Sequence, residues 1–260
     1  MPERVALVTG AGSATGIGFS VARALGRQGL AVAVCSTTDR IHDRARELEH
    51  EGVRAAGLVG DLTDAAVAGS VVEAARARFG PIDVVVNNAG MVTVSEPEVE
   101  EPAFVDLAPD AWEGSLAMNL STAFHVTQAA LPDMIHAGWG RIVMVSSVTG
   151  PVVTNPRSVG YSAAKAGMDG LMRAIAIEVA RAGVTVNSVA PGWIATGSQT
   201  AEEAVAGRHT PVGRSGTPEE IAAVVAFLAT DGASYVTGQS IAVDGGNTIQ
   251  EYKGPPDGYY

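Results

Sequence analysis

Short apolar runs that alternate with amphipathic segments constrain the fold of this chain more than any other feature. The runs lie at 4–9, 31–36, 54–61, 83–86, 141–146, 184–190 and 240–243, and helical periodicity fills most of the intervals between them. Strands that alternate with helices in this way form a parallel sheet, because each helix returns the chain to the same edge. We therefore expect an α/β fold with helices on both faces of one sheet.

The composition suits one α/β domain. Hydrophobic residues make up 47% of the 260-residue chain and glycines number 31, which fits a tightly turned, largely buried sheet. We expect a single domain over residues 1–246, followed by a tail over 247–260 that adds no regular element. The one cysteine, Cys35, lies in an apolar run, so we expect a buried thiol and no internal disulfide.

Net charge and the absence of targeting patterns narrow the partners. A formal net charge of -11 disfavours nucleic acids, anionic membranes and other acidic partners. No apolar run approaches the roughly 18 residues of a membrane span, and the N-terminus carries no signal-peptide pattern. We expect a cytoplasmic protein that acts on a small molecule, and no metal site.

A glycine-rich stretch, Gly10-Ala-Gly-Ser-Ala-Thr-Gly-Ile-Gly18, separates the first apolar run from an amphipathic segment. Glycines let the backbone approach a pyrophosphate, and a helix N-terminus stabilises its negative charge. A plain turn explains such a cluster about as well, but its place at the first strand–helix junction favours a dinucleotide site. The candidate contacts in this stretch are Gly10, Gly12, Ser13, Gly16, Ile17 and Gly18.

The end of the second apolar run bears on the choice of cofactor. An acidic residue there would hold the ribose 2′-hydroxyl of NAD and repel a 2′-phosphate. This chain instead has Ser36, Thr37 and Arg40, which suit a phosphate, so we expect NADP(H). Asp39 keeps NAD(H) as the alternative, and Thr38 or Asp39 could also cap a helix over 41–51.

Tyr161 and Lys165 form an improbable pair, because the chain has five tyrosines and only two lysines. Residues four apart in a helix share a face, so the phenol and the ammonium would point the same way. The ammonium would lower the pKa of the phenol and make it a better proton donor at neutral pH. The plain alternative is an exposed helical pair worth a few tenths of a kcal/mol.

Several further patterns resemble the short-chain dehydrogenase/reductase family, in its classical form, from Val5 to about Gly246. The resemblance implies a single-domain, Rossmann-like, doubly wound parallel sheet of about seven strands in the order 3-2-1-4-5-6-7. The pattern from Pro191-Gly192 to Asp244-Gly-Gly246 looks closest to the 3-oxoacyl acyl-carrier-protein reductases. The motifs that carry the resemblance are the glycine stretch, Asp61, Asn87-Asn-Ala-Gly90, Asn119, Ser147, Tyr161 with Lys165, and Pro191-Gly-Trp-Ile-Ala-Thr196.

The resemblance also implies roles for individual residues. It makes Tyr161 the general acid/base, lets Lys165 hold the nicotinamide ribose, gives Ser147 the substrate oxygen, and assigns Asn119 to a water relay. It further implies a homotetramer built through the helices that begin near Asp110 and Tyr161. Additional cofactor contacts implied by the motifs are Asp61, Leu62, Asn88, Ala89, Gly90, Tyr161, Lys165, Pro191, Gly192, Ile194 and Thr196.

Three segments depart from the family pattern or add to it. Gly10 and Gly16 enclose five residues where the family usually has three; this is similar to the divergent enoyl reductases, whose Tyr-x6-Lys spacing is absent here. Residues 92–106 form an acidic insertion, which is either a solvated excursion or a rim contact beside the substrate. Residues 193–216 are polar and small and suit a mobile lid.

Two features of helices are expected to matter locally. A long helix over 110–137 carries Asn119 in its interior, where asparagine is unfavourable, so we expect a local distortion there. Thr217, Pro218 and Glu220 form a helix start with a cap, a first-turn proline and a capping-box glutamate.

These observations lead to one main hypothesis and two alternatives. We expect an NADP(H)-dependent oxidoreductase that interconverts a ketone and a secondary alcohol, with either a 3-oxoacyl thioester or a small ketone, sugar or secondary metabolite as substrate. An NAD-dependent alcohol dehydrogenase of the same family is the nearer alternative. A dinucleotide-sensing binding protein without turnover is the alternative from another class.

Overall fold

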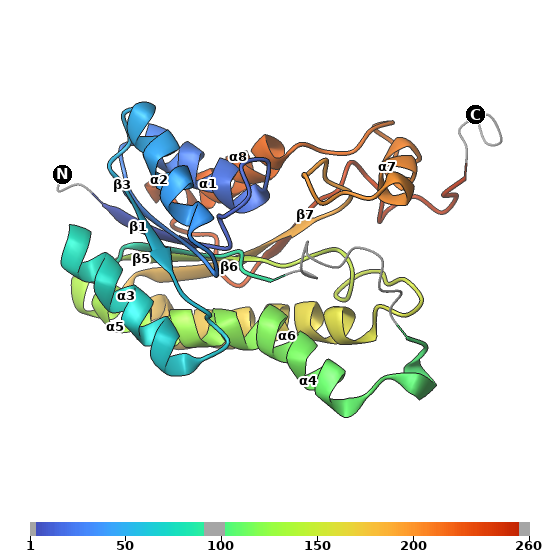
Figure 1. The fold of residues 1–260 in the computed structure, drawn as a ribbon, viewed down its shortest axis with the longest axis horizontal. Helices are drawn as coiled ribbons and strands as arrows, with labels where there is room; N and C mark the ends of the chain where they lie inside the picture. Colours follow the sequence, from blue (N-terminus) through green and yellow to red (C-terminus); the bar gives the residue numbers. More distant parts are fainter. Residues whose placement is uncertain (1–3, 91–101, 255–260) are drawn as a thin grey trace.

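Seven parallel strands form one sheet in the order β3-β2-β1-β4-β5-β6-β7 in a computed structural model, which describes residues 4–90 and 102–254. This order confirms the expected fold. The sheet lies between two helix layers, with α1, α2 and α8 on one face and α3, α5 and α6 on the other (Figure 1). The strands are β1 Val5–Thr9, β2 Ala31–Ser36, β3 Ala55–Val59, β4 Val84–Asn87, β5 Gly140–Val145, β6 Val184–Pro191 and β7 Ser240–Val243.

The helices follow the amphipathic intervals between the strands. The α-helices are α1 Ile17–Arg27, α2 Arg40–His50, α3 Ala65–Phe79, α4 Pro109–Leu116, α5 Thr122–Ala137, α6 Val159–Val179, α7 Ala201–Arg208 and α8 Pro218–Leu228. Four short helical turns complete the described elements: η1 Phe104–Asp106, η2 Ala117–Ser121, η3 Ala180–Ala182 and η4 Asp231–Ala233. Among the described residues, no helix is long and apolar enough to cross a membrane.

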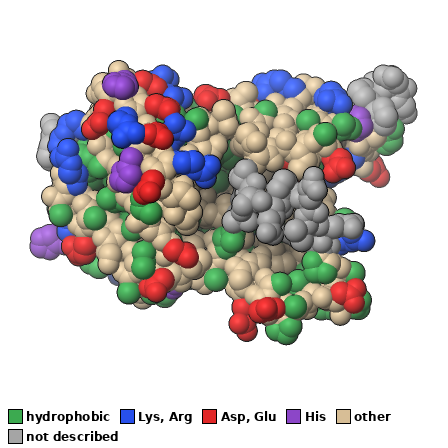
Figure 2. Space-filling view, in the orientation of Figure 1, with side chains coloured by type: hydrophobic (Ala, Val, Ile, Leu, Met, Phe, Trp, Pro, Cys, Tyr) green, Lys and Arg blue, Asp and Glu red, His purple; other side chains and the backbone are tan. Residues whose placement is uncertain are grey.

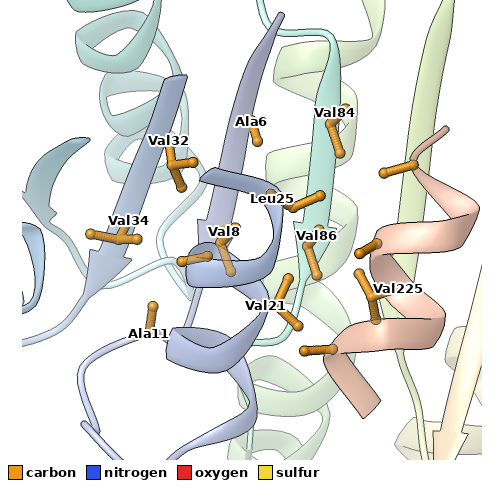
Figure 3. Packing of buried hydrophobic residues seen from close by; sticks show 14 of the residues in the cluster. Ala6, Val8, Ala11, Val21, Leu25, Val32, Val34, Val84, Val86 and Val225 are labelled. Atoms are coloured by element: carbon orange, nitrogen blue, oxygen red, sulfur yellow. The ribbon is translucent and has the colours of Figure 1, made fainter. Parts of the chain in front are cut away.

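The core consists of two clusters, one on each face of the sheet. Val8, Val34 and Val86 point toward α1 and α8, where they pack with residues such as Leu25 and Val225 (Figure 3). Their neighbours along the strands point to the other face and pack against α3, α5 and α6. The strands are therefore buried on both faces, which explains why they read as continuous apolar runs.

The expected helix over 110–137 is interrupted. α4 ends at Leu116, a π-helical turn covers Ala117–Ser121, and α5 resumes at Thr122. Asn119 lies within the π-helical turn, so the expected distortion is present at that residue.

The expected cap of α8 is confirmed, whereas at α2 the side-chain hydrogen bond of the expected cap is absent. At α8, Thr217 and Glu220 form the predicted capping box, with Pro218 in the first turn. At α2, Asp39 occupies the N-cap position but its side chain makes no capping hydrogen bond. The hydroxyl of Thr38 accepts a hydrogen bond from Arg40 Nε instead, at 3.1 Å. The Thr38 side chain therefore bonds to a neighbouring side chain, and neither Thr38 nor Asp39 caps α2 through its side chain.

The remaining segments differ in how much of them is described. Of the acidic insertion 92–106, residues 92–101 lie outside the described residues, whereas Phe104 and Val105 are 73% and 87% exposed. The described part of the tail, 247–254, contains no helix and no strand. Cys35 is buried as expected, and burial raises the pKa of its thiol to about 12. Acidic and basic side chains are interspersed on the face shown in Figure 2.

Candidate active site

The glycine loop between β1 and α1 is braced by a side chain from the end of β4. The side-chain amide of Asn88 donates to the carbonyls of Thr9 and Gly10, each at 3.0 Å. Gly10 has φ 66°, in the left-handed region that favours glycine. A Cβ on Gly18 would lie 2.5 Å from Asn88 Nδ2 and 2.7 Å from the Gly10 carbonyl oxygen. Asn88 therefore shapes the loop through its side chain, a role that the sequence did not indicate.

Thr9 is a site residue that sequence analysis missed. Its Oγ1 accepts hydrogen bonds from the backbone N–H groups of Asn88 and Ala89, at 3.0 and 2.9 Å. Thr9 thus ties the end of β1 to the segment that leaves β4. A polar residue at the carboxyl end of an apolar run was the available signal, because that edge is where ligands bind in such sheets.

The start of α1 fits the phosphates of a dinucleotide. Its N-cap residue, Gly16, offers no capping side chain, and no acidic residue lies in the first turn. The backbone N–H groups of this turn lack intrahelical acceptors and can donate to an anion. The Gly16 N–H already donates to the Ser13 carbonyl at 3.1 Å, which leaves Ile17 and Gly18 as the better candidate phosphate donors.

The end of β2 lies against the same loop. A Cβ on Gly12 would lie 3.0 Å from Ser36 Oγ, so a larger residue at position 12 would require Ser36 to shift by a few tenths of an ångström. Thr37 and Arg40 follow and are exposed. Hydroxyl and guanidinium donors therefore gather at the position where this fold holds the adenosine ribose, and they suit a 2′-phosphate.

Asp61 and Leu62 follow β3 at the same edge of the sheet. The Asp61 carboxylate accepts hydrogen bonds from Thr63 Oγ1 and the Thr63 N–H, at 2.7 and 3.0 Å. These hydrogen bonds lower the pKa of Asp61, so it is ionised at neutral pH. The exposed carboxylate can accept a further hydrogen bond from a bound ligand, whereas the buried Leu62 side chain can contribute only packing.

Tyr161 and Lys165 share the face of α6 that packs near the end of β5. Lys165 is 3% exposed, and its Nζ donates to the Val145 carbonyl at 3.0 Å. The same Nζ lies 5.5 Å from the centre of the Tyr161 ring. This burial argues against the plain alternative of a solvent-exposed helical pair, because burying an ammonium requires a compensating role or partner.

The two serines after β5 have different surroundings. Ser147 hydrogen-bonds with the Tyr161 phenol, and its Oγ also accepts from the Thr149 N–H at 3.0 Å. Ser146 is buried, and its Oγ donates to the carbonyl of Lys165 at 3.3 Å. Ser147 therefore lies beside the phenol as expected, whereas Ser146 supports the backbone of α6.

The charges around the phenol differ from the sequence-based expectation. The pKa of Tyr161 is raised, chiefly by burial and further by the charge of Glu203, and the hydrogen bond with Ser147 only partly offsets this. Lys165 is not among the causes of this shift, so the expectation that it lowers the pKa of Tyr161 is wrong. Burial also lowers the pKa of Lys165 to about 8. Tyr161 therefore keeps its proton at neutral pH, which is the state that a proton donor requires.

Asn119 reaches the site through the π-helical turn. Its Nδ2 donates to the Ser115 carbonyl at 3.2 Å, and its buried Oδ1 has no hydrogen-bond partner among the described residues. A Cβ on Gly90 would lie 2.8 Å from that Oδ1. Gly90 therefore leaves room for a buried acceptor that a water or ligand can use, in keeping with the relay expected for Asn119.

The segment that leaves β6 contains four of the predicted cofactor contacts. Pro191 ends β6, Gly192 packs against Asp244, and Ile194 bridges to Gly216. Thr196 shares a hydrogen bond with Ser198 at 3.0 Å. Pro191 and Gly192 thus lie at the sheet edge, whereas Ile194 and Thr196 belong to the predicted lid over 193–216.

The predicted lid contains a helix, α7, that its composition did not indicate. Thr200 and Glu203 form a capping box at its start, and Glu203 contributes its charge to the surroundings of Tyr161. The pattern Thr200-x-x-Glu203 was the sequence signal for this helix start. At the base of the lid, a Cβ on Gly197 would lie 2.5 Å from Thr15 Oγ1, so the enlarged glycine loop approaches the lid closely.

Comparisons with known proteins agree with this geometry. The family model described as enoyl-(acyl carrier protein) reductase matches residues 10–248. The cis-4-hydroxycyclohexanecarboxylate dehydrogenase of Sinomonas cyclohexanicum is 41% identical, over 95% of this chain and 97% of its own length. The 3-oxoacyl-[acyl-carrier-protein] reductase FabG of Pseudomonas aeruginosa is 39% identical, over 94% of this chain and 96% of its own.

A solved structure shares the whole fold. The crystal structure of a variant of actinorhodin polyketide ketoreductase with NADPH superposes with a TM-score of 0.87 at 36% sequence identity. The match covers 95% of this chain and 98% of the ketoreductase chain. The similarity therefore extends over the sheet edge, the glycine loop and α6 alike.

Proposed function

The chain belongs to the short-chain dehydrogenase/reductase family, and we propose that it is an NADP(H)-dependent enzyme that interconverts a ketone and a secondary alcohol. The observation that carries the proposal is the grouping of Tyr161, Ser147 and Lys165 at the sheet edge that also holds the glycine loop. A phenol, a hydroxyl and an ammonium in this arrangement suit proton transfer to a carbonyl oxygen.

Each of these residues has a separate role in carbonyl reduction. NADPH, when bound, supplies the hydride that adds to the carbonyl carbon. The Ser147 hydroxyl donates a hydrogen bond to the carbonyl oxygen, and Tyr161 transfers its proton to that oxygen as negative charge develops. Lys165 stabilises the phenolate that remains, and Asn119 Oδ1 holds a water that returns a proton to Tyr161. Alcohol oxidation uses the same residues in reverse.

Purified protein with NADPH and a panel of ketones tests this proposal. We expect loss of NADPH absorbance that depends on added ketone for at least one member of the panel, and the reverse reaction with the matching alcohol and NADP. Tight NADPH binding without turnover on any ketone would instead favour the dinucleotide-sensing alternative.

Light scattering on the same preparation tests the proposed homotetramer, and a monomer would contradict it. Fractionation of the source cells tests the proposed cytoplasmic location.

Arg40→Ala is expected to weaken NADPH binding about tenfold and leave NADH binding nearly unchanged, because it removes one cation beside the proposed 2′-phosphate. The measurement is the Kd of each cofactor by fluorescence titration. Arg46→Ala, on the same helix and exposed, is the matched control and should change neither Kd. Equal or better catalytic efficiency of the wild type with NADH would contradict the NADP proposal and favour the NAD-dependent alternative.

Two substrate classes remain in competition, and the relatives support both. The similarity to FabG of Pseudomonas aeruginosa supports a 3-oxoacyl thioester as the substrate of this chain. The similarity to the Sinomonas dehydrogenase supports a small cyclic alcohol or its ketone. Carrier proteins are acidic, so a chain with net charge -11 is a poor match for one, and we favour a small ketone. The Tyr-x3-Lys spacing of residues 161–165 argues against enoyl reduction, despite the description of the matching family model.

A further inference from the structure

The buried face of α6 carries a carboxylate that the proposed mechanism does not use. Asp169 is 2% exposed, and neither of its carboxylate oxygens has a hydrogen-bond partner among the described residues. Arg173 approaches Oδ2 to 4.0 Å, but the Arg173 side chain is 59% exposed and so remains largely hydrated. Burying a carboxylate without a hydrogen bond or a close counter-ion is costly, so its presence requires a reason.

Lys165 lies one helical turn before Asp169 on the same buried side of α6. Residues four apart in a helix are neighbours on its surface, and both of these side chains are at most 3% exposed. The Lys165 ammonium has three N–H donors, and the structure shows one of them bound to the Val145 carbonyl. A buried cation and a buried anion therefore lie one turn apart where little water screens them.

The strand beneath α6 offers a second unsatisfied polar group. Val184 and Val186 of β6 pack in the cluster that contains Met168 and Met172 of α6. Side chains alternate along a strand, so Ser188 points to this same face. Ser188 is fully buried, and its Oγ has no partner among the described residues. The apolar layer between α6 and β6 therefore contains a second buried polar side chain besides Asp169.

We propose that Asp169 is a positioning residue: its carboxylate makes no hydrogen bond with Lys165, but its charge, one helical turn away, keeps the Lys165 ammonium charged beside Tyr161. The inference rests on the proposed function, because only there does the charge of Lys165 stabilise a phenolate. Burial lowers the pKa of Lys165 to about 8, and the charge of Asp169 raises it, so Asp169 opposes the loss of the ammonium. Without that opposition a larger fraction of Lys165 would be neutral at physiological pH.

Other charged groups near α6 are less well placed to do this. On α6 itself, Arg173 would lower the pKa of Lys165 by like-charge repulsion, and Glu178 lies more than three turns away. The lid residue Glu203 acts on Tyr161. β6 and η2 carry no titratable side chain. The remaining titratable side chains on elements packed against α6 are exposed or are bound to other groups: Asp110, Glu113, His125, Asp133, His136, Arg141 and Arg181.

Asp169→Asn tests the proposal directly, because the chain has only two lysines. Carbon-13 labelling at the lysine ε carbon gives one signal for Lys165 and one for Lys253, and each can be titrated by NMR without substrate. We expect the Lys165 midpoint to fall from about 8 in the wild type by about one pH unit in Asp169→Asn. At about pH 7.5 the charged fraction would then drop from about three quarters to about one quarter. The Lys253 signal is the internal control.

The controls separate charge from packing. Asp169→Glu keeps the carboxylate and should retain a Lys165 midpoint near the wild-type value. Arg173→Gln removes the exposed cation beside Asp169 and should leave the midpoint unchanged or slightly raised. If Asp169→Asn yields no folded protein, Asp169→Ser removes the charge with a smaller side chain, and the same midpoint decides the matter.

An unchanged Lys165 midpoint in a folded, uncharged variant at position 169 would overturn the proposal. So would a variant pair in which Arg173→Gln and Asp169→Asn destabilise the protein equally while Lys165 titrates as before, because Asp169 would then serve Arg173. In an active enzyme, kcat falls at high pH, and this fall should shift to lower pH together with the Lys165 midpoint. A shifted midpoint in a protein that turns over no ketone would refute the proposed function and leave the coupling of Asp169 to Lys165 intact.

Discussion

Tyr161→Phe is expected to lower kcat for ketone reduction by about a hundred- to ten-thousandfold, because it removes the group that donates the proton. The substitution deletes one oxygen and keeps the ring, so the packing beside Lys165 at 5.5 Å should persist. The Kd for NADPH should change little, since the glycine loop and the end of β2 are untouched. Steady-state rates of NADPH oxidation and a fluorescence titration of NADPH measure the two quantities separately.

Tyr235→Phe is the matched control for this experiment. It makes the same chemical change at a tyrosine that is fully exposed, and both constants should equal those of the wild type. A Tyr161→Phe protein with wild-type kcat would show that another group donates the proton, and the assignment of Tyr161 would fail. A loss of NADPH affinity as large as the loss of kcat would indicate a disturbed cofactor site and not a missing acid.

The pattern of apolar runs was sufficient to predict the sheet, because in a doubly wound fold every strand is buried on both faces. The strand order came with the family resemblance, and the structure confirms it. The cap and first-turn proline at Thr217 and Pro218 were also predictable, since the interactions that make a helix start are local in sequence. Strands that are buried on both faces and helix starts made by neighbouring residues can therefore be predicted from the sequence.

Contacts between segments that are distant in the sequence were harder to predict. Asn88 carried a signal as a polar residue at a strand end, but its hydrogen bonds to the loop carbonyls depend on how β1 and β4 pair. The raised pKa of Tyr161 was missed because burial depends on everything that packs around the phenol, whereas the four-residue spacing showed only its neighbour Lys165. Asp169 was missed for the same reason, since a single carboxylate in a helical pattern reads as an exposed residue until the sheet is in place.

Gly18→Ala is expected to lower the free energy of unfolding by about 1–3 kcal/mol and to weaken NADPH binding at least about tenfold. The added methyl group would lie 2.5 Å from Asn88 Nδ2 and 2.7 Å from the Gly10 carbonyl oxygen, so Asn88 or the loop must move. Both belong to the proposed phosphate site, and the displacement would therefore disturb binding as well as packing. Urea denaturation and NADPH titration measure the two effects.

Gly69→Ala makes the same change in the interior of another helix and should have the opposite effect on stability. Among the described residues, no atom other than those of its chain neighbours and of the backbone of α3 lies within 4 Å of the added methyl group, so the alanine meets open space. Helix propensity then favours alanine by up to about 1 kcal/mol, and NADPH affinity should not change. A Gly18→Ala protein that is stabilised like Gly69→Ala, with wild-type NADPH affinity, would mean that the close approach of α1 to Asn88 is unnecessary for the site. The pair of variants therefore distinguishes a glycine required by its neighbours from one that the helix merely tolerates.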